Sequence, residues 1–175
     1  NGVLRGIKGD FFEGGIRVPF TMQWPKKIKP GITYDKPIIA LDVFATVASA
    51  ASAEKYIKND IDGVDLLPYL TGDKFGLPHE YLYWQNPDKD IDVVRDERYK
   101  YLRIKNDEYI FDLKNDISEE TNIINSSKPI YDRLKSQFKE WEKGMIDPVF
   151  MDLGMGKEYD KLNPDRWFND SNPKK

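Results

Sequence analysis

Cysteine is absent from this sequence of 175 residues, so the chain can form neither disulfide bonds nor thiolate metal sites. That absence says little about the cellular compartment. Histidine occurs once, at position 79. No segment approaches the ~18 consecutive apolar residues of a membrane-spanning helix, and a net charge of −3 lacks the basic excess of a nucleic-acid-binding domain. What remains is a globular composition, with 39% hydrophobic and 13% aromatic residues.

The sequence begins with Asn1 and Gly2 rather than with methionine. We therefore expect it to be a C-terminal piece of a longer protein, in which case a missing signal peptide says nothing about export. Its length suits one domain or two small ones and allows a substantial core.

Residues 4–19, LRGIKGDFFEGGIRVP, contain four glycines, which let a backbone turn through positive φ and approach a ligand closely. Lys8 lies among them, and a lysine in such a loop is a compact positive charge that can be aimed at an anion. Neither G-x-x-x-x-G-K-[ST] nor G-x-G-x-x-G is present. The residue types leave two interpretations open, an anion-binding loop or a tight loop leading into a buried strand. We expect Arg5, Glu13 and Arg17 to pair with one another and shape this loop.

Apolar patterns along the chain predict an α+β protein. A buried strand is expected at 18–24 and a helix with a broad apolar face at 41–53. Residues 62–72 predict a turn and a short helical segment that stops at Gly72. Asp62 and Asp65 are acidic, but two carboxylates make a weak metal site, and helix capping is the better interpretation.

Four β-prone segments follow, at 80–85, 92–95, 99–105 and 109–113. Their short polar connections are typical of antiparallel neighbours. In the third segment Lys100, Leu102 and Ile104 alternate with more polar residues, so we expect one apolar face, covered on that side alone. The predicted cover is a helix at 129–143, whose apolar residues recur at helical spacing: Ile130, Leu134, Phe138 and Trp141.

Three segments together resemble the sulfatase family. LRGIKGDFFEGGIRVPF and the QWPKKIKPG that follows are similar to its LRGGKG-x-x-x-EGG-x-R-x-P and W-P-x-x-I-x-P-G. DGVDLLPYLTG resembles D-G-x-[SD]-L-x-P-x-L-x-G. VRDERYKYL and YIFDLKNDISEETNI resemble V-R-x-x-x-Y-K-Y and L-Y-D-L-x-x-D-P-x-E-x-x-N. The resemblance extends over roughly residues 1–143; its departures include Ala45, where the family's Asp-x-x-P-T pattern has proline.

The resemblance implies a division of the chain into three parts. Residues 1–60 would be the C-terminal edge of a large α/β sulfatase domain, carrying the glycine loop, a strand and a helix. Residues 61–146 would form the small α+β C-terminal domain, a four-stranded antiparallel sheet packed against a C-terminal helix. Residues 147–175 are rich in large apolar side chains, so we expect an irregular tail that packs back onto the body.

The resemblance also implies a function, the hydrolysis of sulfate monoesters of a carbohydrate or an aryl alcohol. Lys8 matches the family's lysine that reaches the sulfate, and it is the candidate catalytic and substrate-binding residue. The family's nucleophile is a formylglycine made in [CS]-x-P-x-R, a pattern that neither 127–131 nor 171–175 completes. Its divalent cation, usually Ca²⁺, would have its ligands upstream of residue 1. We therefore expect no metal bound by this piece, and no turnover without the rest of the parent protein.

Other interpretations stay open. The chain could belong to a phosphomonoester or phosphonate hydrolase of the same alkaline phosphatase superfamily. It could instead be a non-catalytic module that binds a glycan or a protein through aromatic residues such as Tyr83, Trp84 and Trp167. His79 is a second, weaker substrate-binding candidate, and it inherits no role from the family.

The expected partners are the missing N-terminal part of the same protein and a sulfated small molecule or glycan, without nucleic acid and without a membrane span. Kinship implies a periplasmic or secreted parent, although the sequence itself does not fix the compartment.

Overall fold

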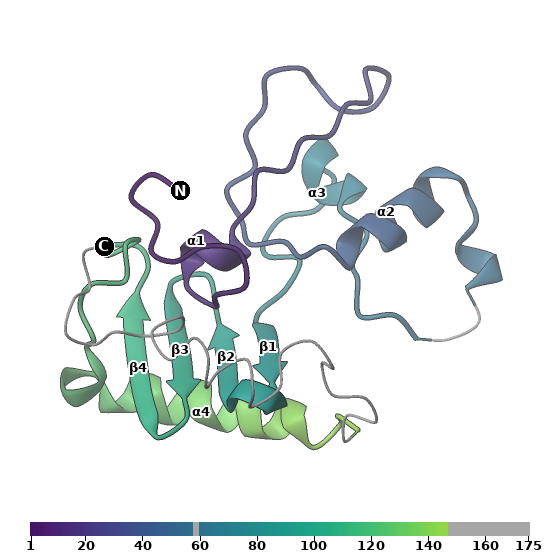
Figure 1. Ribbon diagram of the computed structural model, residues 1–175. Coiled ribbons are helices and arrows are strands. Elements are labelled where there is room, and N and C mark those ends of the chain that lie inside the picture. Colours follow the sequence, from purple (N-terminus) through teal and green to yellow (C-terminus); the bar gives the residue numbers. More distant parts are fainter. Residues whose placement is uncertain (58–59, 147–175) are drawn as a thin grey trace. The chain divides into compact units, whose positions relative to one another are not determined.

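A computed structural model describes residues 1–57 and 60–146 of the chain (Figure 1). The described residues form two compact units: unit 1 contains 1–18 together with 83–146, and unit 2 contains 19–82. The predicted boundary near residue 60 concerns the domains of a longer parent and stays a prediction. The predicted packing of residues 147–175 lies outside the described residues.

The described part of unit 1 contains one sheet, whose strands lie in the order β1-β2-β3-β4 (Figure 1). The pairs β2–β3 and β3–β4 are antiparallel, with Val93 opposite Leu102 and Tyr101 opposite Ile110. The predicted four-stranded antiparallel sheet is confirmed, with strand ends within two residues of those expected. The strands are β1 (Leu82–Asn86), β2 (Ile91–Arg95), β3 (Tyr99–Ile104) and β4 (Asp107–Asp112).

Both faces of the sheet are covered. The predicted C-terminal helix is confirmed as α4 (Lys128–Glu142), which buries Leu134 and Phe138. It packs on the face that carries Tyr101, whose ring centroid lies 6.0 Å from that of Tyr131 in α4. The expectation that the helix would cover the Leu102 face is therefore wrong. The reason is that a tyrosine ring is largely apolar, so the Tyr101 face can also be buried.

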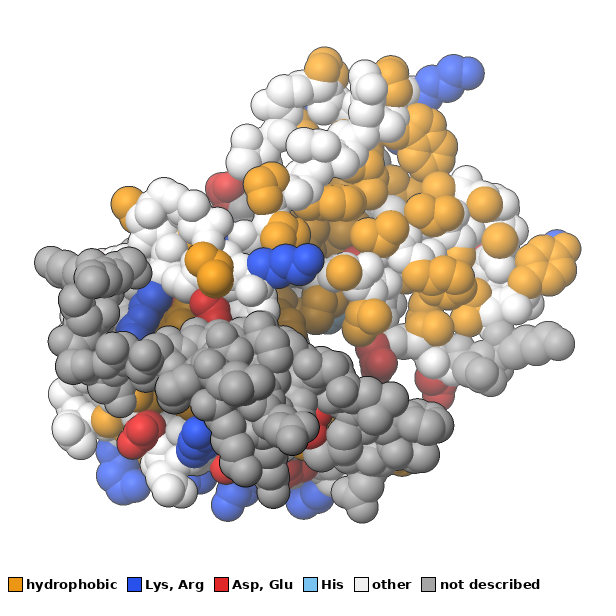
Figure 2. Space-filling model, in the orientation of Figure 1, with side chains coloured by type: hydrophobic (Ala, Val, Ile, Leu, Met, Phe, Trp, Pro, Cys, Tyr) orange, Lys and Arg blue, Asp and Glu red, His pale blue; other side chains and the backbone are white. Residues whose placement is uncertain are grey.

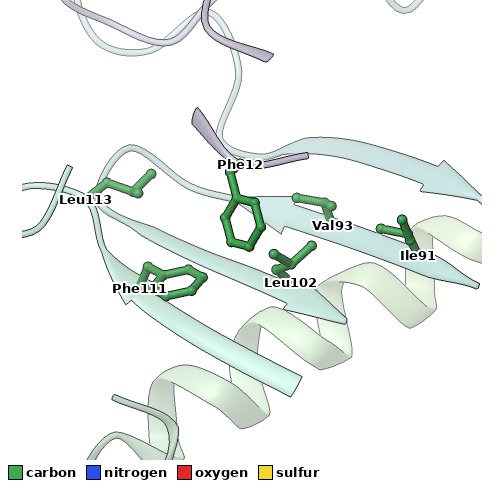
Figure 3. Close-up of a cluster of buried hydrophobic side chains, with 6 residues drawn as sticks. All are labelled: Phe12, Ile91, Val93, Leu102, Phe111 and Leu113. Carbon is green, nitrogen blue, oxygen red and sulfur yellow. The ribbon is translucent and has the colours of Figure 1, made fainter. Parts of the chain in front are cut away.

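The opposite face packs against the glycine-rich segment. Phe12 lies over this face, and α4 lies on the other side of the sheet (Figure 3). The rings of Phe12 and Phe111 meet edge to face with their centroids 6.1 Å apart. The buried members of this cluster are Phe12, Ile91, Val93, Leu102, Phe111 and Leu113. The sheet therefore supports the glycine-rich segment directly.

The outer edge of β4 is protected by the segment that follows it. Ile123 N donates to Ile110 O at 2.9 Å. The Asn122 side chain accepts from Ile110 N and donates to Glu108 O, each at 3.0 Å. These bonds satisfy backbone groups that an edge strand would otherwise expose. The segment then passes through η3 (Ile124–Ser126) into α4.

Unit 2 contains α2 (Asp42–Ala50), η1 (Glu54–Tyr56) and α3 (Leu67–Thr71). The predicted stop at Gly72 is confirmed, since that residue has a left-handed φ of 86°. Asp65 accepts a hydrogen bond from Leu67 N at 2.9 Å, but the N-cap position of α3 is Leu66, so Asp65 is not the N-cap that was expected. The helix predicted at 41–53 is present but shorter.

The apolar face predicted for α2 is largely exposed. Ala45 and Ala48 are buried, whereas Phe44 and Val47 are each 59% exposed. Hydrophobic side chains gather on the face of unit 2 that Figure 2 shows. The sequence pattern therefore identified an apolar face, but not one that this chain buries.

The strand predicted at 18–24 is wrong. These residues form no strand with any other part of the chain that the structure describes. Val18 is 73% exposed and Phe20 is 47% exposed. An apolar, β-prone segment becomes a strand only when a neighbouring strand pairs with its N–H and C=O groups, and none of the four described strands does so.

Candidate functional site

Lys8 stands in a tight turn of unit 1. Asp10 N donates to Ile7 O at 2.9 Å, and Ile7 N donates to the Asp10 carboxylate at 2.7 Å. Gly9 has a φ of 95°, as the third position of a type II turn requires. The Lys8 side chain is exposed, and it forms no hydrogen bond or ion pair with the residues that the structure describes. The turn therefore presents an ammonium group that is available to a ligand.

The backbone on either side of this turn folds back on itself. Helix α1 (Glu13–Ile16) is a single turn that lies against residues 5–10. A Cβ atom at Gly14 would stand 2.4 Å from Gly6 O, and one at Gly15 would stand 2.2 Å from Asp10 O. Both distances are far shorter than van der Waals contact, so the close approach of the two backbones requires glycine at each position.

Four fully or largely buried charged side chains connect this loop to the sheet. We call them the buried ionic cluster: Glu13, Arg95, Lys100 and Glu119. Lys100 Nζ lies 3.3 Å from Glu13 Oε1 and 2.7 Å from Glu119 Oε1. Arg95 Nη1 donates to Glu13 Oε2 at 3.0 Å. Glu119 Oε2 accepts a hydrogen bond from Glu13 N at 2.6 Å. Glu13, Lys100 and Glu119 expose no surface to solvent.

The charges of the buried ionic cluster balance, with two carboxylates against two cations. Burial raises the pKa of the Glu119 carboxyl, and the Lys100 ammonium acts in the opposite direction. Removing one partner from such a group leaves an uncompensated buried charge, which is strongly destabilising. The stability of the buried ionic cluster therefore depends on all four side chains being present.

We expected the charged residues of this loop, Arg5, Glu13 and Arg17, to pair with one another, and they do so only in part. Arg17 Nη1 lies 3.9 Å from Glu13 Oε2, but its side chain is 57% exposed. Arg5 instead donates to Glu119 O at 2.8 Å and lies 4.0 Å from the centroid of the Phe12 ring. The sequence contained one signal for the partners of Glu13 that were not predicted. Lys100 lies on the same strand face as Leu102, where a charged side chain would be buried.

His79 belongs to unit 2, where it approaches the start of α2. Its Nε2 atom lies 2.7 Å from Oδ1 of the fully buried Asp42, and 12% of its side chain is exposed. The Asp42 carboxylate also accepts from Ile39 N and Val64 N, each at 2.9 Å. Lys8 and His79 lie in different units.

Two of the three aromatic residues considered for stacking on a sugar, Tyr83 and Trp84, pack within unit 1. Tyr83 stacks on Trp141 of α4, with ring centroids 5.0 Å apart and an interplanar angle of 2°. Trp84 packs against the hydrophobic cluster around Phe12. Trp167 lies outside the described residues. Tyr83 and Trp84 therefore contribute to the core of the unit.

No three His, Asp or Glu side chains within residues 1–57 and 60–146 are grouped so that they could hold a metal ion. The described residues therefore do not fit the cation that the sulfatase resemblance implies. None of the helices in the same ranges is long and apolar enough to cross a bilayer.

Comparison with known proteins gives a consistent result. Residues 8–144 match the protein family described as N-sulphoglucosamine sulphohydrolase, C-terminal. Steryl-sulfatase of Mus musculus is 47% identical over 83 residues, which cover 47% of this chain and 13% of that protein. The uncharacterized sulfatase YdeN of Escherichia coli is 37% identical over 116 residues, covering 62% of this chain and 20% of that protein.

Two further proteins match more of the chain. The ulvan-active sulfatase of Formosa agariphila is 28% identical, over 81% of this chain and 36% of its own length. The crystal structure of Ps i-CgsB in complex with k-i-k-neocarrahexaose has a TM-score of 0.74 and 25% identity, over 100% of this chain and 39% of that one. The chain thus spans between 13% and 36% of the length of the three curated relatives.

Proposed function

Since the chain belongs to the family described as N-sulphoglucosamine sulphohydrolase, C-terminal, we propose that it is the C-terminal portion of a sulfatase that hydrolyses sulfate monoesters. These relatives are sulfatases from mouse and from bacteria, and the aligned segment covers between 13% and 36% of each. In this proposal the chain supplies part of the substrate cleft and one sulfate-contacting group.

That group is Lys8. The observation that supports it is an exposed ammonium on a tight turn, without an internal partner among the described residues. A lysine so placed would neutralise sulfate charge on binding, and would stabilise the negative charge that develops as the ester bond breaks. His79 is a weaker substrate-binding candidate, because its Nε2 atom is already engaged by Asp42.

The substrate class is inferred from the relatives. One acts on ulvan by its name, one is named for steryl sulfates, and Ps i-CgsB was solved with a neocarrahexaose. We infer a sulfated carbohydrate or aryl alcohol. The alternative is a phosphomonoester or phosphonate hydrolase of the same superfamily, and parallel assays with matched sulfate, phosphate and phosphonate esters would separate the two.

The nucleophile and the divalent cation would come from the rest of the parent protein. Such a cation would supply Lewis-acid chemistry in the intact parent protein. The residues that the structure describes provide no site for this cation. A parent sequence that lacks both [CS]-x-P-x-R and acidic metal ligands would favour the alternative of a non-catalytic binding module.

The experiment that tests the proposal measures sulfate release by the full-length protein. Lys8→Ala is expected to lower kcat by about 10²–10³-fold, the usual cost of removing one group that stabilises transition-state charge. Lys139→Ala is the matched control, because Lys139 is an exposed lysine of the same unit on α4. An unchanged kcat/KM for Lys8→Ala would remove the role assigned to this lysine.

A further inference from the structure

The structure assigns to Glu119 and Lys100 a role in positioning Lys8: we propose that the buried ionic cluster fixes the loop that carries the sulfate-contacting ammonium. This inference rests on the function proposed above, and it extends that function to residues of the small sheet that touch neither substrate nor nucleophile. Lys100 and Glu119 expose no surface, so any effect they have on the reaction must pass through another group.

Glu119 is connected to the loop through two of its groups. Its carboxylate holds the backbone N–H of Glu13 at 2.6 Å, and its backbone carbonyl accepts from the Arg5 guanidinium at 2.8 Å. One residue therefore contacts the loop on both sides of the Lys8 turn, three residues before it and five residues after it.

Glu13 is in turn connected to the Lys8 turn through the backbone of α1. Glu13 begins α1, and the next two residues are the glycines whose backbone lies against Gly6 and Asp10. Because the two backbones are in close contact at those glycines, a displacement of α1 must displace residues 5–10 as well. The position of the Lys8 turn is therefore set by the position of Glu13.

The backbone at Glu119 gives independent support. Its φ is 55°, in the left-handed region that residues other than glycine, asparagine and aspartate seldom adopt. The Asp116 carboxylate holds the turn by accepting from Glu120 N at 3.1 Å and from Thr121 N at 2.8 Å. A glycine would adopt this conformation with less strain. The glutamate is therefore explained by what its side chain does, which is to bind Lys100 and Glu13.

Glu119→Gln tests the inference without changing the size of the side chain. The glutamine carbonyl can still accept from Glu13 N, but its amide would face the Lys100 ammonium across a contact that is now 2.7 Å. In the full-length protein this variant is expected to lower kcat by about 10–100-fold, with a smaller change in KM, because a small misplacement of a group that acts in the transition state is costly.

Glu108→Gln is the matched control. Glu108 is also a hydrogen-bonded carboxylate of the sheet, but its partners are Tyr101, Tyr131 and Lys135, on the α4 side. The control should destabilise the unit while leaving the Lys8 turn in place.

Amide hydrogen exchange of Asp10 and Gly14, whose N–H groups bond within the loop, should accelerate at least about tenfold in Glu119→Gln alone.

A double-mutant cycle separates positioning from general damage. If Glu119 acts through Lys8, then Lys8→Ala/Glu119→Gln should be no slower than Lys8→Ala. The inference would be overturned if the fold-losses in kcat of the two single variants multiplied in the double variant. It would also be overturned if amide hydrogen exchange in the loop changed equally in Glu119→Gln and Glu108→Gln. An unchanged kcat/KM in Lys8→Ala would instead contradict the proposed role of Lys8. The exchange measurement would still report whether Glu119 fixes the loop.

Discussion

Asp42 is fully buried, yet its carboxylate has three hydrogen-bonding neighbours, the backbone N–H groups of Ile39 and Val64 and the ring of His79. Gly63 makes this arrangement possible, because a Cβ atom there would stand 2.1 Å from Leu41 O. A buried carboxylate needs such partners to offset its loss of hydration. Asp42 therefore joins three separate segments of unit 2 at the first turn of α2.

The Asp42–His79 contact gives a prediction about His79. His79→Ala should lower the free energy of unfolding by about 1–3 kcal/mol, because the buried Asp42 carboxyl group would lose one of its three hydrogen-bonding partners. Urea unfolding measures this effect, and Glu80→Ala, at the exposed neighbouring position, is the control. If His79 is purely structural, KM for the sulfate ester should stay constant. A raised KM at unchanged stability would instead identify His79 as a substrate contact.

Residue roles were predictable from sequence only where they depend on neighbours in the chain. Gly72 acts within its own turn, and its role was predicted correctly. Glu119 and Lys100 meet Glu13 from more than 80 residues away, which no local pattern can indicate. A charged residue at an inward-facing strand position, as at Lys100, is the one local signal for such a cluster, because burial of a charge demands a partner.

At the scale of elements, α4 is joined to the sheet by polar contacts as well as by its apolar face. The Glu108 carboxylate accepts from Tyr101 at 2.6 Å, from Tyr131 at 2.8 Å and from Lys135 at 2.7 Å. Burial alone would raise the pKa of Glu108, but these hydrogen bonds outweigh it and lower the pKa from 4.5 to about 2. The contact between β4 and α4 is therefore strongest when Glu108 is ionised.

This lowered pKa gives a pH dependence with a defined sign. The folded protein binds the Glu108 proton more weakly than the unfolded chain, so the stabilisation is present above pH 4.5 and is lost as the pH falls toward about 2. The loss should amount to about 2–3 kcal/mol. Urea unfolding between pH 2 and pH 6 measures it. Glu108→Gln should flatten the profile, whereas Glu140→Gln, at a carboxylate that is 71% exposed, should leave its slope unchanged.

Element types were predictable from periodicity, but their environment was not. The alternation in β3 and the helical spacing in α4 depend on sequence alone, and both elements form where expected. Which face of the sheet α4 covers was not predictable, because Phe12 competes for the Leu102 face from a distant part of the chain. Residues 18–24 have strand-like composition, yet strand formation depends on a pairing partner that composition does not reveal.

At the scale of the whole molecule, the chain accounts for 36% or less of the length of each curated relative named here. The exposed apolar residues of α2 are explained if the rest of the parent protein covers them. Leu41, Phe44 and Val47 are 53%, 59% and 59% exposed, and their spacing of three places them on one side of the helix. We propose that this α2 face packs against the remainder of the large domain.

The exposed α2 face leads to one expectation for the isolated chain and to another for the full-length protein. In the isolated chain, the face should bind the dye ANS, and Phe44→Ser/Val47→Ser should reduce the fluorescence severalfold. In the full-length protein, the same double variant should lower the unfolding midpoint, because burying each side chain contributes about 1.5–3 kcal/mol. Phe75→Ser, at a single aromatic residue that is 90% exposed outside the helix, is the control for dye binding. A full-length protein that tolerates both serines without loss of stability would show that this face stays uncovered, and the proposed packing would be wrong.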